Sequence, residues 1–357
     1  MKTNRVKSIE LWRLFFAVLV LIWHTRYLPW FFDEKRILMS AHATDFFLLL
    51  SGFLMAKYAE KPLHGTLGED CWHFILGKIG KFYPMYLLAI VFDLLSRWIA
   101  TGNTVETGAL SFYAWDLLLL RAAGLHGSVM PGTAIGASWY LMAMVLAMAV
   151  LYPLLRANRD VFLHVLAPLV SMFLYGWFSQ VKGSISFTMA FDHGVSMGLL
   201  RAIAGICLGC VCYQLCENMK QSQWKWSRRL RVGMTLLELF AAFVIVYFSI
   251  TYGAGQTDFI CILLAAVILV GEFSGLSLIH TAAQKLRTDW IASFTLALYV
   301  CQCTWLELIG NMDLNVTPGV GLVLFIGASA ITAVAFVWAI KGIRWFLART
   351  KTRGQTA

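Results

Sequence analysis

The stretch Ile9–Leu28, IELWRLFFAVLVLIWHTRYL, decides the fold of this chain. It is long and apolar enough to cross the hydrocarbon core of a bilayer as one helix. It also holds Arg13 and His24, and ionisable groups inside a membrane span are costly, so both are candidates for function. They are eleven positions apart. This spacing is close to three full helical turns, so both side chains share one face, roughly 16 Å apart along the axis.

The composition of the whole chain has the same character. Of its 357 residues, 59% are hydrophobic and 13% are charged, and the mean hydropathy is +0.71. A soluble domain could not bury that much apolar surface. Repeated apolar windows therefore predict an all-α, polytopic membrane bundle of about ten transmembrane helices. We expect residues 1–357 to form a single membrane domain, in which 341–357 is a basic cytoplasmic tail.

Charge sets the expected orientation of the spans. The stretch Ala109–Leu125 is apolar but short, and it contains Asp116 and Arg121. If it were a span, the basic segment 220–231 would lie opposite Met1–Ser8, which the positive-inside rule disfavours. We therefore expect both termini in the cytoplasm and 102–137 as a long outer loop with an interfacial or re-entrant helix. The expected spans lie near 9–28, 44–59, 82–101, 138–155, 161–178, 197–217, 233–251, 258–273, 290–310 and 320–340.

The net charge of +10 and the eight cysteines have simple explanations. The basic residues fall mainly in loops, where they anchor the spans, so we expect no nucleic acid partner. Cys207 and Cys210 have the spacing of a metal or redox pair, but no histidine lies near them in the sequence. They are interpreted as small buried hydrophobic residues. We expect neither a disulfide framework nor a metal site.

Two groups of polar residues emerge once the spans are oriented. The second span descends from the outside, so Asp45 at its start is expected at about the depth of His24. An imidazole beside a carboxylate is suited to general base catalysis, because the carboxylate fixes the tautomer and stabilises the imidazolium. At the inner surface, Arg13, Lys78 and Lys81 form a cationic group suited to the phosphates of a cytoplasmic donor.

Each of these residues also has a structural interpretation. A histidine near the end of a span often faces lipid headgroups, and Arg13 could extend to the inner surface as an anchor. Asp45 could cap the second helix. Ser51 and Gly52 are typical of close helix packing in membranes. The residue pattern alone does not choose between the two interpretations.

The order of these motifs resembles the acyltransferase 3 family of bacterial integral-membrane O-acyltransferases. The Arg13-x10-His24 spacing resembles the first-helix signature of that family. Asp45–Phe53 is similar to its second-helix motif, an acidic residue and aromatics that end in Ser-Gly. Similar family elements are found at Lys78–Pro84, Ser138–Leu141, Tyr152–Pro153 and Arg201-x3-Gly205-x3-Gly209.

The resemblance implies an activity and a set of partners. The family transfers acyl groups, often acetyl, from a cytoplasmic coenzyme A thioester to carbohydrate or lipid-linked acceptors. It implies a multi-pass acyltransferase of the bacterial inner membrane that transfers groups other than aminoacyl groups. Acyl-CoA, membrane lipids and a glycan would be its partners, and no cofactor would be bound permanently. His24 would be the essential imidazole, and Arg13, Lys78 and Lys81 would belong to the donor site.

The sequence departs from the family pattern at several positions. Leu48 stands where the family usually has phenylalanine, and Lys78 and Lys81 replace the commoner arginines. The lysines keep the charge but lose bidentate phosphate geometry. The family often has histidine near the position of Gln302. Hydrogen bonds in an acceptor or oxyanion pocket are expected from Ser51, Trp139, Tyr140 or Gln302.

Two other classes of protein remain alternatives. A transporter or flippase of a lipid-linked glycan would suit ten spans with buried charges, although the paired repeats and broken helices of many transporters are not evident. A scaffold without activity would leave Arg13 and His24 unexplained. The sequence leaves open the acceptor, the acyl group, the oligomeric state, and whether transfer is direct or passes through an acyl-enzyme.

Overall fold

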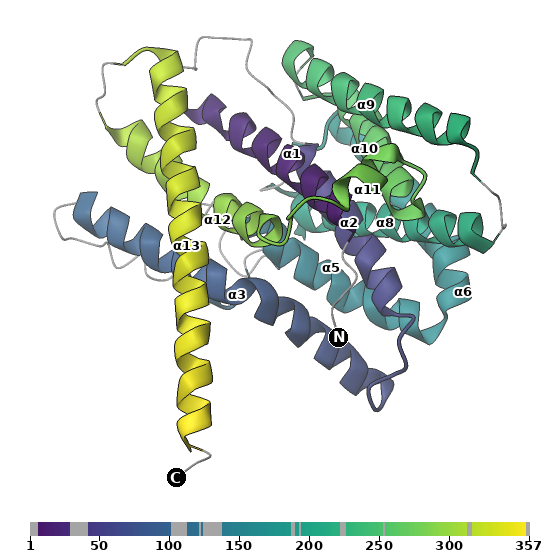
Figure 1. The fold of residues 1–357 in the computed structure, drawn as a ribbon, viewed down its shortest axis with the longest axis horizontal. Helices are drawn as coiled ribbons and strands as arrows, with labels where there is room; N and C mark the ends of the chain where they lie inside the picture. Colours follow the sequence, from purple (N-terminus) through teal and green to yellow (C-terminus); the bar gives the residue numbers. More distant parts are fainter. Residues whose placement is uncertain are drawn as a thin grey trace.

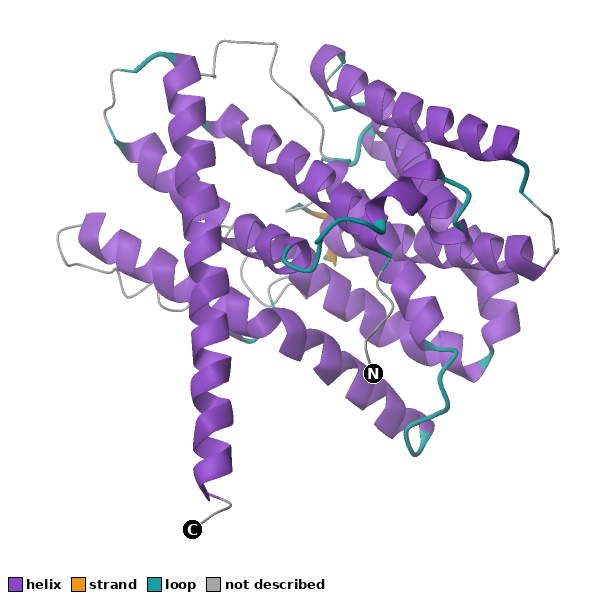
Figure 2. Cartoon of the chain, in the orientation of Figure 1, coloured by secondary structure: helices purple, strands orange, loops and turns teal. Residues whose placement is uncertain are grey.

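Long helices make up almost all of the described chain in the computed structural model (Figures 1 and 2). The only strands within the described residues are β1 (Phe191–Asp192) and β2 (Val195–Ser196), a short antiparallel pair. This confirms the all-α prediction. The structure describes residues 6–28, 42–100, 113–120, 123, 138–186, 190–192, 194–221, 226–252, 254–312 and 316–354.

The helices follow the apolar windows of the sequence. The helix α6–η4–α7–η5 is continuous, with π-helical turns at η4 and η5. In chain order the helices are α1 (Lys7–His24), η1 (Thr25–Tyr27), α2 (Ala43–Tyr58), α3 (Leu67–Ala100), α5 (Ser138–Ala157), α6 (Arg159–Val161), η4 (Phe162–Leu166), α7 (Ala167–Trp177), η5 (Phe178–Lys182), α8 (Met197–Gln221), α9 (Arg228–Thr251), α10 (Thr257–Ser274), α11 (Leu278–Ala283), α12 (Ile291–Asn311) and α13 (Pro318–Gly354).

Nine helical segments of the described residues are long and apolar enough to cross a membrane. The expected span at 44–59 corresponds to α2, which has 16 residues and is shorter than these nine. Most of its side chains are buried, and it packs against α1, α8 and α10. The protein is therefore a multi-pass membrane protein with α2 inside the bundle.

Close packing of α2 on α8 depends on glycine. A Cβ atom on Gly52 would lie 2.0 Å from the carbonyl oxygen of Ile206, and one on Gly209 would lie 2.0 Å from that of Leu49. No side chain fits at either position, so the two backbones touch directly. Gly52 on α2 and Gly209 on α8 therefore both allow the close approach of these two helices.

The stretch Ala109–Leu125 does not form a span in its described part. A helical segment at 113–117 packs against the middle of α3. The hydroxyl of Tyr113 donates to Asp93 at 2.8 Å, and the hydroxyl of Tyr83 donates to the carbonyl oxygen of Leu117 at 3.0 Å. Asp93 and Tyr83 are ten positions apart on α3, about 15 Å along its axis. These contacts favour the re-entrant alternative over the interfacial one.

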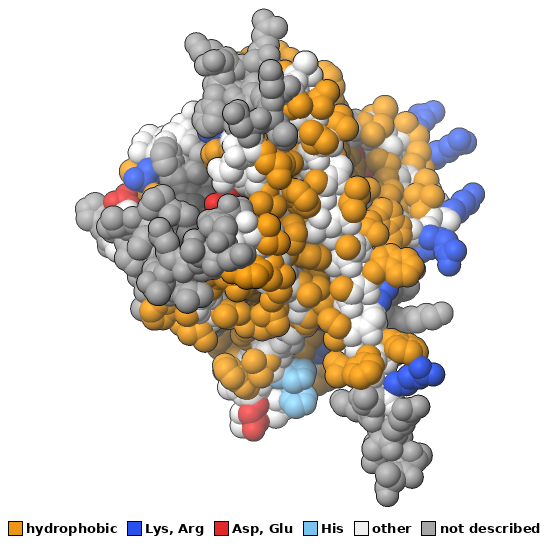
Figure 3. All heavy atoms as spheres, turned by 90° about the vertical axis from the view of Figure 1, so that its left-hand side faces the viewer, with side chains coloured by type: hydrophobic (Ala, Val, Ile, Leu, Met, Phe, Trp, Pro, Cys, Tyr) orange, Lys and Arg blue, Asp and Glu red, His pale blue; other side chains and the backbone are white. Residues whose placement is uncertain are grey.

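The outer surface of the bundle is apolar. Figure 3 shows hydrophobic side chains over most of the face that is turned to the viewer, with charged side chains near its edges. On α13, Ile331 and Trp338 are each 72% exposed, as expected for side chains that face lipid. The described part of the expected basic tail, 341–354, continues α13 as a helix that extends beyond the rest of the bundle (Figure 1).

Candidate functional site

The three cations expected at a donor site lie together. Lys78 on α3 is close enough to Arg13 on α1 and to Lys81 for their charges to interact. Arg13 forms an ion pair with Glu10 at 3.6 Å. The ammonium of Lys78 lies 5.4 Å from the ring centre of Phe74, and Lys81 is exposed. We call this group (Arg13, Lys78, Lys81) the cationic cluster, and the end of the bundle that holds it the basic end.

Tyr140 on α5 connects the cationic cluster with the interior of the bundle. Its buried hydroxyl lies near Ser51, whose own hydroxyl donates to the sulfur of Met144 at 3.3 Å, and within electrostatic reach of both Arg13 and Asp45. Its ring meets the ring of Tyr299 on α12 edge-on, with the centres 5.6 Å apart. Ser51 and Tyr140, which were expected to line a pocket, therefore lie near each other between the two charged groups.

Asp45 is the anion of a buried ion pair. Both of its carboxylate oxygens accept from Nε of Arg201, at 3.1 and 3.3 Å, and one also accepts from the hydroxyl of Tyr175 at 3.2 Å. Arg201 also donates to the carbonyl oxygen of Ile185, and its guanidinium lies 5.3 Å from the ring centre of Trp139. Asp45 and Arg201 are almost fully buried. Burying both charges is tolerable because each is paired and hydrogen-bonded.

The expected pairing of Asp45 with His24 is wrong. No hydrogen bond or ion pair joins these two residues, both of which lie in the described part of the chain. The reason is the register of α1 and α2, which is set by the stacked rings of Phe16 and Phe46, 4.1 Å apart. Since α1 and α2 run in opposite directions, this contact puts Asp45 at about the level of Ala17, seven positions before His24, or about 10 Å along the axis.

His24 is held by the backbone instead of by a carboxylate. Its Nδ1 lies 2.8 Å from the carbonyl oxygen of Val20, one turn earlier on α1. A carbonyl oxygen only accepts, so Nδ1 carries a proton and Nε2 of the neutral ring has the lone pair. The edge of the Trp23 indole also contacts the ring, with centroids 4.7 Å apart. His24 is therefore a half-buried imidazole whose Nε2 is in the form that can accept a proton. We call its end of the bundle the His24 end.

Gln302 contributes a buried acceptor. Its side chain is 1% exposed, and its amide nitrogen donates to the carbonyl oxygen of Tyr299 at 3.2 Å. Its Oε1 is buried and has no hydrogen-bond partner among the described residues. Leaving a buried acceptor unsatisfied costs about 1–3 kcal/mol. A polar group of a substrate, or a water molecule, would satisfy it, and the pocket role of Gln302 stays a prediction.

Sequence reasoning missed a second buried network, at the start of α2. Nδ1 of His42 lies 3.2 Å from Asp258 on α10, and its Nε2 lies 3.3 Å from the hydroxyl of Ser249 on α9. His42 is more than 200 positions from both Ser249 and Asp258, which flank the turn between α9 and α10. No spacing in the sequence could have revealed them.

This network has the residue types of a serine hydrolase triad but a different hydrogen-bond pattern. The hydroxyl of Ser249 donates its one proton to the carbonyl oxygen of Ile245 at 2.6 Å. Nδ1 of His42 donates to the carboxylate of Asp258, and Nε2 contacts the hydroxyl of Ser249 without receiving its proton. The network therefore lacks the hydrogen bond from serine to base that a triad needs.

The cysteines provide no redox or metal pair in the described structure. All eight are free thiols, and Cys207 and Cys210 are buried. No cluster of three or more histidine, cysteine or acidic side chains suited to a metal ion occurs among the described residues. Cys207 and Cys210 pack within the apolar core.

A polar column therefore runs through the apolar bundle, and we define it by Arg13, Lys78, Tyr140, Asp45 and Arg201. Such buried ionisable groups are typical of membrane proteins that transport or transform a polar substrate. The family model of the acyltransferase domain matches residues 6–341, and the chain belongs to this family. No curated protein and no solved structure matches the chain.

Family membership determines the class of reaction. The protein is a membrane acyltransferase, which transfers groups other than aminoacyl groups. Cations and hydrogen-bond donors lie in the polar column, and the imidazole of His24 lies on α1, the helix that also carries Arg13. Family membership favours this class over the transporter and the scaffold.

Proposed function

We propose that the protein transfers an acyl group, in the simplest case acetyl, from cytoplasmic acyl-CoA to a hydroxyl group of an extracytoplasmic or lipid-linked glycan. The membrane would be the inner membrane of a bacterium. The observation that carries the proposal is the arrangement along the column. Cations gather at the basic end, and at the opposite end of the same helix lies an imidazole whose Nε2 has the lone pair.

The cationic cluster is suited to the donor. Acyl-CoA carries several phosphate charges, and Arg13, Lys78 and Lys81 would bind them through charge-assisted hydrogen bonds. By the positive-inside rule this end of the bundle would face the cytoplasm, where acyl-CoA is made. The distance from Arg13 to His24, roughly 16 Å along α1, is one that the extended pantetheine arm of coenzyme A could bridge.

The chemistry would take place near His24. Nε2 would accept the proton of the acceptor hydroxyl while the hydroxyl oxygen attacks the thioester carbonyl carbon. The new C–O bond forms, the C–S bond breaks, and the proton passes from the imidazolium to the sulfur of coenzyme A. The carbonyl oxygen of Val20, which accepts from Nδ1 at 2.8 Å, would hold the ring and stabilise the imidazolium.

The middle of the column would guide the donor arm. Tyr140 and Ser51 lie near each other there, and Trp139 lies against Arg201. Together with Gln302 these groups could hydrogen-bond the amides of the arm or the carbonyl that reacts. Asp45 would have no direct part in proton transfer, because Arg201 and Tyr175 occupy its oxygens.

Sealed membrane vesicles of both orientations test the proposal. Radiolabelled acetyl-CoA added outside inside-out vesicles should label a glycan or lipid fraction and release free coenzyme A in equal amount. Right-side-out vesicles should do neither, because their cationic cluster faces the lumen. Movement of a glycan without consumption of the thioester would show a transporter and contradict the proposal.

A further inference from the structure

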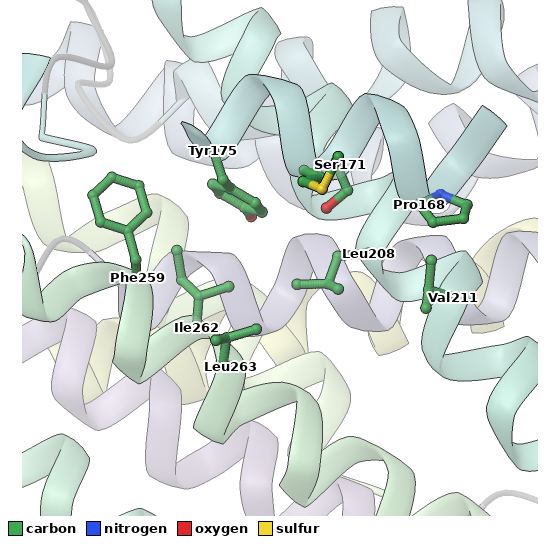
Figure 4. A pocket seen from close by; sticks show the side chains of 9 residues that line it. Pro168, Ser171, Tyr175, Leu208, Val211, Phe259, Ile262 and Leu263 are labelled. Carbon is green, nitrogen blue, oxygen red and sulfur yellow. The ribbon is translucent and has the colours of Figure 1, made fainter. Parts of the chain in front are cut away.

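An apolar groove opens on the side of the bundle between α7 and α10, with α8 as its floor (Figure 4). Its volume is about 340 Å³. Only two of the lining side chains, Ser171 and Tyr175, carry an oxygen atom. The groove is lined by Pro168, Ser171, Met172, Tyr175, Leu208, Val211, Phe259, Ile262 and Leu263.

The groove faces the hydrocarbon of the membrane. Met172 on α7 and Leu263 on α10 stand at its mouth and are each 59% exposed, whereas Ile262 is buried. The helices of all three walls belong to candidate spans. The π-helical turns at η4 and η5 lie on either side of α7. Such turns interrupt regular helix geometry, and they frequently occur at functional sites.

One wall of the groove is joined to the polar column. The ring of Tyr175 lines the groove, and its hydroxyl donates to Asp45 at 3.2 Å. Glycine at position 205 makes room for this contact, because a Cβ there would lie 3.3 Å from the hydroxyl of Tyr175 and 2.7 Å from Leu48. A ligand that fills the groove would therefore lie directly beside the buried Asp45–Arg201 pair.

A polar pair, Ser179 and Gln256, lies about one helical turn beyond the lining residues Tyr175 and Phe259, towards the His24 end, and we call it the polar rim. There the hydroxyl of Ser179 donates to the amide oxygen of Gln256 at 2.8 Å, and the amide nitrogen of Gln256 donates to the carbonyl oxygen of Ser179 at 2.9 Å. Pro168, towards the basic end, and Tyr175 are seven positions apart, which is about 10 Å of α7. An apolar slot of this length with a polar rim fits an amphiphile whose headgroup lies at the His24 end.

We infer that this groove binds the hydrocarbon chain of the lipid that carries the acceptor. The inference rests on the proposed function, and it makes the acceptor a lipid-linked molecule. The apolar lining excludes a glycan or a phosphate from the groove itself. A long acyl chain of the donor would arrive from the basic end, whereas the polar rim lies at the His24 end. The acceptor headgroup would then emerge at the end of the bundle where the imidazole lies.

A photolabelling experiment tests whether the groove takes a hydrocarbon chain. The full-length protein is reconstituted in vesicles of phosphatidylethanolamine and phosphatidylglycerol that contain phosphatidylglycerol with a diazirine in one acyl chain. After illumination, labelled peptides are mapped by mass spectrometry. We expect labelling of Met172 and Leu263 to exceed that of Ile260, which is 48% exposed on the same helix as Leu263 but lies outside the groove.

Two tryptophan variants make the test specific. Leu263→Trp should fill the mouth of the groove and reduce labelling at Met172 severalfold, while the matched control Ile260→Trp should leave it unchanged. Even labelling of Met172 and Ile260, or labelling at Met172 that persists in Leu263→Trp, would overturn the inference.

A pair of acceptors tests whether the chain belongs to the acceptor. Decyl β-glucoside and methyl β-glucoside share a headgroup and differ only in the chain. With labelled acetyl-CoA, Leu263→Trp should raise the KM for the decyl compound about tenfold, which corresponds to about 1.4 kcal/mol of binding. The KM values for the methyl compound and for acetyl-CoA should not change.

The outcomes separate the two proposals. An equal change for both glucosides, or a change in the KM of acetyl-CoA, would overturn the assignment of the groove to the acceptor chain. Failure of the wild-type protein to transfer acetyl to any acceptor would contradict the proposed function instead. The photolabelling result would then still decide whether the groove holds a lipid chain.

Discussion

Arg201 on α8 donates hydrogen bonds to the carboxylate of Asp45 on α2 inside the bundle. Asp45 is therefore paired with Arg201 and not with His24. Asp45 and Arg201 are 156 positions apart. Their contact holds α2 against α8 at the His24 end of the Gly52–Ile206 contact. It also sets the position of Tyr175, and through it one wall of the lipid-facing groove.

Breaking this pair should destabilise the protein. Arg201→Ala leaves Asp45 as an uncompensated buried charge, which typically costs about 3–5 kcal/mol. We expect a clear fall in the melting temperature in detergent, measured by fluorescence-detected size-exclusion chromatography. Arg201→Lys should not restore it, because an ammonium cannot reproduce the fork geometry. The double variant Asp45→Leu/Arg201→Met should be more stable than Arg201→Ala, and equal instability of the two would argue against the ion pair as the cause.

The same pair predicts the role of Asp45 in the reaction. Because Asp45 does not touch His24, Asp45→Asn should leave the acidic limb of the pH–rate profile unmoved in whatever protein remains folded. The measurement is initial acetyl transfer over a range of pH at saturating donor. A shift of the limb in Asp45→Asn would show that the carboxylate is coupled to the titrating base after all.

His24→Ala should abolish acyl transfer while the protein still inserts and folds. General base catalysis is typically worth about 10²–10⁴-fold in rate. The matched control is His164→Ala, since His164 is exposed and lies in η4 outside the polar column. Turnover in labelled acetyl transfer is compared at equal amounts of inserted protein. Wild-type turnover in His24→Ala would exclude His24 as the base.

Neutralising the cationic cluster should weaken donor binding. A hydrogen bond to a charged group is worth about 1.5–3 kcal/mol, so Arg13→Ala or Lys81→Ala should raise the KM for acyl-CoA roughly tenfold to a hundredfold. The KM for the acceptor should hardly change, Lys81→Glu should be worse than Lys81→Ala, and Lys81→Arg should be tolerated. Arg229→Ala, an exposed arginine on α9, is the control. Unchanged coenzyme A binding in Arg13→Ala and Lys81→Ala would make the cluster a topology anchor only.

Ser249 should not act as a nucleophile. Its hydroxyl donates to the carbonyl oxygen of Ile245 and not to His42, so a fluorophosphonate probe should leave it unlabelled, and Ser249→Ala should keep most of the transfer activity. His42→Ala should instead lower thermal stability, because it leaves the buried carboxylate of Asp258 without its hydrogen-bond partner on His42. Probe labelling that is lost in Ser249→Ala would identify a working triad and contradict this reading.

The class of fold and the cationic cluster could be read from the sequence. Apolar windows of spanning length have no other stable solution in a bilayer than helices, so the all-α bundle follows from composition and length. The expected spans 9–28 and 82–101 run in the same direction, and Arg13, Lys78 and Lys81 lie near their expected inner ends, so the similar depth of the three cations follows from counting residues. Their proximity in the structure agrees with that count.

The partners of Asp45, His24 and His42 were decided by tertiary structure alone. Counting residues gives the depth of a side chain in the membrane, and its accuracy depends on knowing where each helix starts. It gives neither the rotation of a helix about its axis nor the helices that lie beside it. The stacking of Phe16 on Phe46 shifts Asp45 by about 10 Å from His24, and the glycine contact of α2 with α8 brings Arg201 to it. Side-chain packing between distant segments decides both contacts. In a bilayer the lipid tails are as apolar as the helix faces, so the apolar pattern of a helix does not show which face meets which neighbour.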